Sequence, residues 1–112
     1  MASKMYIAIL DEAPDYMVPT LVAHSVVNAH INMNWFPEYR DWLENSFRKV
    51  TIRVSRAEYQ KIKDNCDEWW EGSENTICEG KGCCLVILPM ESEDRPHVLR
   101  AAKLWAPRKE VE

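Results

Sequence analysis

The sequence has little glycine and no long apolar run, and both shortages restrict what the chain can be. Three glycines and six prolines among 112 residues argue against long flexible linkers and favour one domain. The longest apolar run, residues 83–88, is much shorter than a membrane-spanning helix requires. The residues after Met1 also lack the apolar core of a signal peptide. We therefore expect a cytoplasmic globular protein that does not enter a membrane.

The four cysteines show no metal-binding pattern. Cys66, Cys78, Cys83 and Cys84 include no Cys-x-x-Cys pair, and the three histidines do not follow at zinc-finger spacing. In the cytoplasm such cysteines are free thiols, and those in an apolar run behave as small buried hydrophobes. We expect neither a metal site nor a cofactor. The formal net charge of −4 argues against a surface that attracts phosphate over its whole area.

Hydrophobic periodicity predicts eight elements in the order β-α-α-β-α-β-β-α. Their expected bounds are residues 5–10, 19–34, 35–45, 47–54, 55–72, 75–78, 83–88 and 92–107. The first strand is apolar almost throughout, which is typical of a central strand covered on both faces. Ser55 and Glu58 form a capping box at the start of the third helix. Gly80 and Gly82 predict a hairpin turn between the last two strands.

These elements predict a single α/β domain over residues 1–107, followed by a short tail over 108–112. Strands that are joined through helices become parallel neighbours, and the hairpin adds an antiparallel partner. We therefore expect a four-stranded mixed β-sheet flanked by helices. Truncation of Ile9 or Ile87 should destabilise that sheet.

The element order and two short motifs resemble the class-II peptidyl-tRNA hydrolase superfamily over about residues 4–106. The first motif is Ala23-His24-Ser25 on the first helix, and the second is the run over residues 85–89, Leu-Val-Ile-Leu-Pro. The resemblance implies a hydrolase that cleaves the ester between a peptide and the terminal ribose of tRNA. It implies a catalytic role for His24, with Glu79 in place of the family's Asp and Lys81 in place of its Arg.

The chain departs from the family at two positions that bear on catalysis. Residues 16–19, Tyr-Met-Val-Pro, stand where the family has a Gly-Lys pair, and the hairpin has no counterpart of the family's threonine. Our first hypothesis is therefore a non-catalytic or weakly catalytic domain that binds a protein or a tRNA-related partner. An active peptidyl-tRNA hydrolase is the second hypothesis, and a homodimeric protein that binds a small ligand is the third.

The residues themselves add a candidate ligand site. Asp11 follows the predicted central strand, and the carboxyl ends of such strands are where α/β sheets form ligand crevices. Asn28 lies one turn from His24 on the same helix flank, and Lys81 could pair with a phosphate at the hairpin tip. Solvated loop acids, an exposed turn lysine and a histidine bonded to a backbone carbonyl are the alternative interpretations.

Five tryptophans are many for a chain of this length. Trp35 and Trp42 lie outside the clearest periodic segments, and Trp70 should be rotated away from the core face that Trp69 occupies on a helix. We expect Trp35, Trp42 and Trp70 to form a surface for a protein partner or for self-association. Binding of tRNA through base stacking is a further possibility, and additional core volume is the alternative.

Overall fold

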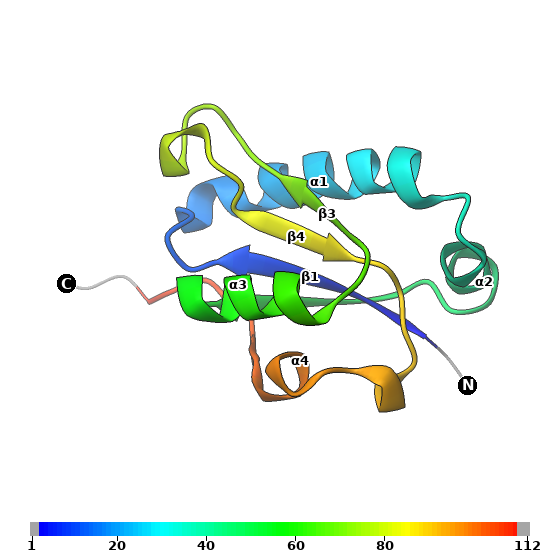
Figure 1. The fold of residues 1–112 in the computed structure, drawn as a ribbon. Coiled ribbons are helices and arrows are strands. Elements are labelled where there is room, and N and C mark those ends of the chain that lie inside the picture. Colours follow the sequence, from blue (N-terminus) through cyan, green and yellow to red (C-terminus); the bar gives the residue numbers. More distant parts are fainter. Residues whose placement is uncertain (1–2, 110–112) are drawn as a thin grey trace.

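The protein is built on a five-stranded mixed sheet. Figure 1 labels three of its strands, β3, β4 and β1, which lie side by side. The computed structural model describes residues 3–109. The sheet order is β3-β4-β1-β2-β5. The strands are β1 (Lys4–Leu10), β2 (Arg48–Val54), β3 (Trp69–Gly72), β4 (Cys84–Ile87) and β5 (Lys103–Leu104).

Strand β1 is the central strand, as its apolar sequence predicts. It runs parallel to β2 and antiparallel to β4, and its residues from Met5 to Leu10 are all buried. Strand β2 carries the predicted alternation in its second half, because Ile52 and Val54 are buried whereas Thr51 and Arg53 are partly exposed.

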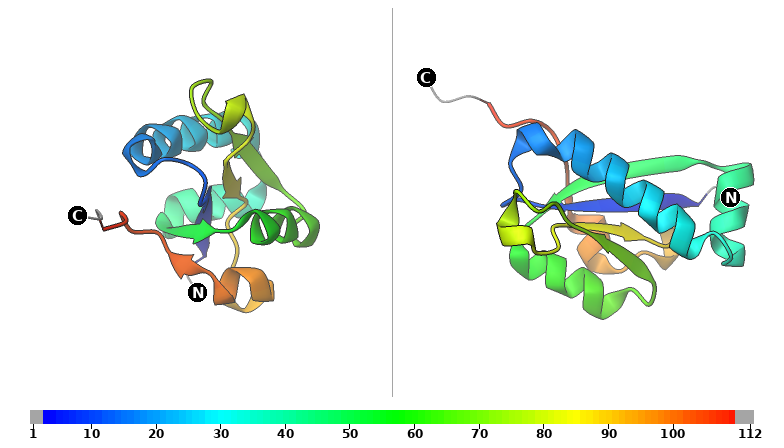
Figure 2. Two further views of the ribbon diagram at one scale, coloured as in Figure 1. Left: turned by 90° about the vertical axis from the view of Figure 1, so that its left-hand side faces the viewer. Right: turned by 90° about the horizontal axis from the view of Figure 1, so that it is seen from above.

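The helices lie on both faces of the sheet and at one end of it. They are α1 (Val18–Met33), α2 (Pro37–Asn45), α3 (Arg56–Asn65) and α4 (His97–Ala101), with 3₁₀ turns η1 (Asp15–Met17), η2 (Cys78–Gly80) and η3 (Ser92–Asp94). Figure 2 shows α1 on one face and α3 with α4 on the opposite face. No helix among residues 3–109 is long and apolar enough to cross a membrane.

One close contact shows which strand residues face α1. Gly72 of β3 lies directly against Ser25 of α1, because a Cβ added to Gly72 would come within 1.9 Å of the Ser25 hydroxyl oxygen. Gly72 is paired with Cys84, and Cys84 is paired with Ile9, so these three residues share one face of the sheet. Their sequence neighbours face α3.

The third helix is shorter than predicted. Its capping box is present, with the Glu58 N–H donating to the Ser55 hydroxyl and the Ser55 N–H donating to the Glu58 carboxylate. The helix ends at Asn65, because Cys66 adopts extended backbone angles. The prediction that this helix reaches Gly72 is wrong. Trp69 instead pairs with Ile87 in the sheet, where its large aromatic ring is favoured.

The predicted strand at residues 75–78 is also absent. Residues 73–83 form a connection that contains η2, and the antiparallel partner of β4 is β3. The prediction of a tight hairpin with its turn at Gly80 and Gly82 is wrong, because a longer connection joins the two paired strands. The strand pairing stops at Gly72 and Cys84, and the backbone between them turns through a left-handed segment.

The last predicted helix, residues 92–107, is three elements. Pro96 disfavours helical angles at Arg95, so the chain forms η3, then the short α4, and then the edge strand β5. Leu104 pairs with Ile52, and this pairing supplies the fifth strand that the four-strand prediction lacked. Of the predicted tail, residues 108 and 109 are described, and residues 110–112 lie outside the described part of the chain.

Candidate functional site

The carboxyl ends of β1 and β2 form the first candidate site. The two strands are parallel neighbours, yet the chain leaves β1 toward α1 and leaves β2 toward α3 on the opposite face (Figures 1 and 2). In α/β sheets, ligands are commonly bound beside the carboxyl ends of strands whose connections turn to opposite faces in this way. The sequence prediction placed Asp11 here, and the structure does so too.

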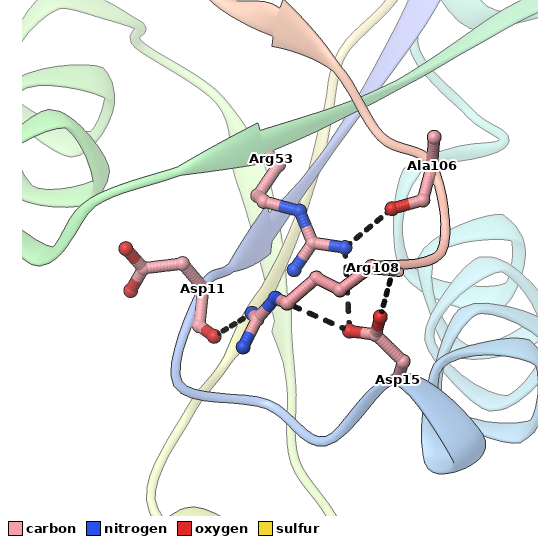
Figure 3. Close-up of polar contacts among 5 residues, drawn as sticks. All are labelled: Asp11, Asp15, Arg53, Ala106 and Arg108. Carbon is pink, nitrogen blue, oxygen red and sulfur yellow. Dashed lines mark hydrogen bonds and ion pairs between the residues drawn. The ribbon is translucent and has the colours of Figure 1, made fainter. Parts of the chain in front are cut away.

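A three-residue ion-pair network of Asp15, Arg53 and Arg108 lies at this end of the sheet, as Figure 3 shows. The Arg53 guanidinium lies 3.2 Å from the Asp15 carboxylate and donates to the carbonyl oxygen of Ala106 at 2.6 Å. The backbone N–H of Arg108 donates to Asp15 at 2.6 Å. That hydrogen bond, with smaller contributions from Arg53, lowers the pKa of Asp15 below its usual value. The network therefore fastens the chain after β5 to the loop after β1.

Asp11 takes part in this network through its backbone only. Its carbonyl oxygen accepts a hydrogen bond from the Arg108 guanidinium, whereas its carboxylate points away from the network (Figure 3). Arg53 also lies 5.1 Å from the centre of the Trp105 ring. Arg53 thus contacts a carboxylate, a carbonyl and a ring, and these contacts fasten this corner of the fold. Its other terminal nitrogen, Nη1, is buried and has no hydrogen-bond partner among the described residues.

The predicted hairpin residues line a second hollow at the same end of the sheet. Glu79 and Lys81 lie with Glu12, Arg56 and Cys78 around a cavity of about 450 Å³. Arg56 is hydrogen-bonded to Glu12, and this bond raises the pKa of the Arg56 guanidinium. Lys81 lies 3.5 Å from Glu79. Both cations of the cavity are thus paired with carboxylates, so a phosphate would have to displace those partners.

The backbone of this hollow is strained. Cys78, Glu79 and Gly80 all have positive φ angles, of 48°, 56° and 75°. Only glycine adopts this region without cost, so Cys78 and Glu79 are held there by the surrounding structure. This strain could not be predicted from the sequence, because neither Cys nor Glu favours a left-handed conformation.

His24 and Asn28 lie elsewhere, on the outer surface of α1. Both line a shallow hollow with Pro19, Ala23 and Val27, and the His24 side chain is 54% exposed. Its Nδ1 atom lies 4.0 Å from the Glu74 carboxylate. His24 and Glu79, the two residues implied as catalytic, therefore line different hollows.

The three tryptophans predicted to form one surface are in three different environments. Trp35 is 68% exposed and stacks on Phe36, with ring centres 4.0 Å apart. Trp42 is only 1% exposed, and its indole N–H donates to the carbonyl oxygen of Arg48 at 2.7 Å. Trp70 is half-buried in β3, a strand, so the helical argument for its exposure is wrong. Trp42 is therefore core, and of the three only Trp35 is mainly exposed.

The outer face of α1 is a surface that the sequence prediction missed. Val27 and Ile31 of α1 are 60% and 62% exposed and lie four residues apart, and the exposed Trp35 follows in the turn just after the helix ends at Met33. Between Tyr16 and Pro37 the chain has no Asp, Glu, Lys or Arg. An exposed helix without one charged side chain is unusual in a chain of which 29% is charged. The uncharged run could have indicated this surface from the sequence. The helical periodicity was used only to predict the buried face of the helix.

Comparison with known proteins assigns no relationship. No protein-family model matches the sequence, and no curated protein matches it.

Proposed function

We propose that the chain is a non-catalytic binding domain that recognises a protein surface through the outer face of α1, and that its first partner is a second copy of itself. The observation that carries the proposal is the exposed, uncharged row of Val27, Ile31 and Trp35. Interface centres are depleted in charged residues and enriched in aromatic ones, and this row has that composition.

A second copy fits this face for two reasons. In a two-fold dimer each patch meets an identical patch, which a strongly charged patch opposes and an uncharged one permits. Ala23, Val27 and Ile31 also form a ridge at intervals of four residues, which packs into the groove of an antiparallel α1. The small Ala23 side chain lets the two helix axes approach closely there.

The proposal keeps the class-II peptidyl-tRNA hydrolase-like fold and leaves out its reaction. It draws support from the exposure of His24 and from the separation of His24 and Glu79 into different hollows. Incubation of the purified protein with a peptidyl-tRNA should release no free tRNA. Release that disappears in a folded His24→Ala variant would contradict the proposal and favour the hydrolase.

Sedimentation velocity of the full chain tests the dimer. We expect the wild-type protein to sediment as a dimer at tens of micromolar and Val27→Glu to sediment as a monomer. Ala57→Glu is the matched control, because it places the same charge at an exposed position of α3 and should leave the dimer intact. Neither change should alter the free energy of unfolding of the monomer by more than about 0.5 kcal/mol. A wild-type monomer at every concentration tested would overturn the assignment of the partner.

A further inference from the structure

A cavity of about 560 Å³ lies at the other end of the sheet, beside the amino-terminal end of β1. It is an open cavity lined by residues of α2, of the end of α3 and of the segment that follows β4. Figure 1 shows α2 on the right and α3 in the centre of the view. Its size lies in the range of small-molecule sites. We propose that this cavity binds a ligand that carries an alkylammonium or guanidinium group. The proposal is independent of the α1 surface.

The charge of the cavity is of one sign. Among the described residues that line it there is no Lys, Arg or His, but there are six acids: Glu38, Asp41, Asp67, Glu68, Glu91 and Asp94. Carboxylates gathered around one space repel each other, and a bound cation removes that repulsion. The acids come from three separate segments of the chain, so no sequence pattern brings them together.

A second observation is independent of the charge. Ser3 lines the cavity and is only 6% exposed, yet its hydroxyl has no hydrogen-bond partner within residues 3–109. One carboxylate oxygen of Glu91, Oε2, is likewise buried and has no partner in that part of the chain. A buried polar atom that makes no hydrogen bond destabilises the folded protein, and more so when it is charged. Two such atoms in the wall of one cavity indicate that a donor is missing there.

The backbone places these two unpaired groups beside each other. Lys4 and Met90 form an antiparallel bridge, with the Lys4 N–H donating at 2.9 Å and the Met90 N–H donating at 3.1 Å. The bridge is isolated, and Ser3 before Lys4 and Glu91 after Met90 are the two residues that would form the next antiparallel pair. Side chains of such a pair project to the same side. An ammonium group has three N–H donors and could satisfy the hydroxyl oxygen and the carboxylate oxygen together.

The rest of the wall suits an organic cation better than a metal ion. No group of three or more His, Cys, Asp or Glu with the proximity that a metal requires occurs within residues 3–109, so the acids are spread around the cavity. Phe36, Leu88 and Met90 supply an apolar surface among them. Such a surface accommodates the methylene stem of a lysine, an arginine or a polyamine, and the ring of Phe36 can receive the cation.

Isothermal titration of the full chain at low salt is the test, with three probes. They are spermidine, an acetylated peptide amide that contains two lysines and a leucine, and Mg²⁺. We expect the peptide or spermidine to bind and Mg²⁺ to bind at least about tenfold more weakly. The organic probe that binds identifies the source of the cation. Binding should weaken as salt is added.

Matched variants locate the site. Glu91→Gln should weaken binding about tenfold, the loss expected for one charged hydrogen bond, whereas Glu93→Gln should change it less than about twofold. Glu93 is exposed, carries the same charge and does not line the cavity. Ser3→Ala should weaken binding without lowering the thermal midpoint, because the hydroxyl has no partner to lose.

Asp94→Asn is a second test variant in case Glu91→Gln does not fold, because Asp94 lines the cavity but is exposed. It should weaken binding severalfold in a protein that melts like the wild type. Three results would overturn the proposal: no binding of either organic probe at millimolar concentration, tighter binding of Mg²⁺ than of both, or equal losses in Glu91→Gln and Glu93→Gln.

Discussion

Replacement of Gly72 by alanine tests the packing of α1 on the sheet. The added Cβ would lie 1.9 Å from the Ser25 hydroxyl oxygen, 2.7 Å from the Ser25 Cβ and 3.3 Å from its Cα. Rotation of the serine removes only the first clash, because Cβ and Cα are fixed to the helix. Helix α1 must therefore move away from β3 for Gly72→Ala to fold.

The expected loss follows from two opposing effects. Extra volume in a packed core costs about 1–3 kcal/mol, and a clash with backbone-fixed atoms belongs at the upper end. Replacement of glycine by alanine also lowers the conformational entropy of the unfolded chain, which stabilises the folded protein by about 0.4–1 kcal/mol. We therefore expect a net loss of about 2 kcal/mol in the free energy of unfolding, measured by urea denaturation. For a domain of this size that loss lowers the thermal midpoint by roughly 10 °C.

Gly82→Ala is the control, because its Cβ would meet Glu71 at 2.2 Å, which is a similar overlap. Here the obstacle is the end of a side chain, which can rotate away if it gives up its contacts with Tyr59 and Lys63, so the loss should be smaller. Ser25→Ala removes the nearest oxygen, and the double variant with Gly72→Ala should be more stable than the sum of the two single losses predicts. Additive losses, or equal losses for Gly72→Ala and Gly82→Ala, would refute the inference that the helix backbone limits this contact.

Three further predictions concern charge, strain and thiols. Because the folded protein lowers the pKa of Asp15 from 3.8, its stabilising contribution is present above that pH and is lost as pH falls through the lower folded value. Urea midpoints of wild type and Asp15→Asn should therefore differ at pH 7 and converge in acid. Glu79→Gly should raise the free energy of unfolding by up to about 1 kcal/mol, since it removes left-handed strain, and Glu79→Ala should not. Burial raises the pKa of Cys84 to about 12, so in a thiol-reagent assay the half-buried Cys78 should react first and the buried thiols only on unfolding.

The sequence predicted well those elements whose signal is local. The apolar run of β1, the alternation of β2 and the capping box of α3 each depend on neighbouring residues, and all three are present. The predicted bounds are wrong where pairing with a strand that is distant in the sequence determines the secondary structure. Trp69 fits a helical stripe by spacing, but pairing with Ile87 places it in β3. Leu104 likewise fits a helical pattern by spacing, but its pairing with Ile52 places it in β5.

The candidate residues were predicted by chemical type, and the structure separates them by position. Asp11 lies at the carboxyl end of the central strand as expected, because the end of a strand follows from its sequence. Which residues meet around a cavity does not follow from sequence, because loop geometry decides it. Trp42 shows the same limit, since its exposure depends on β2, whose Arg48 carbonyl receives its N–H.

Both proposed surfaces are defined by something that is absent, and this explains why residue types alone did not reveal them. The outer face of α1 lacks charge where solvent contact normally favours it. Among the described residues, the acidic cavity has neither a basic side chain in its lining nor a hydrogen-bond partner for the Ser3 hydroxyl. An absence carries information only when the position is known to be exposed or buried. Uncharged residues in a helix are ordinary if the helix is core, and an unpaired serine is ordinary if it faces water. Only the fold shows which of these residues are buried and which are exposed. With that knowledge, each missing charge or hydrogen-bond partner indicates a site that can be tested.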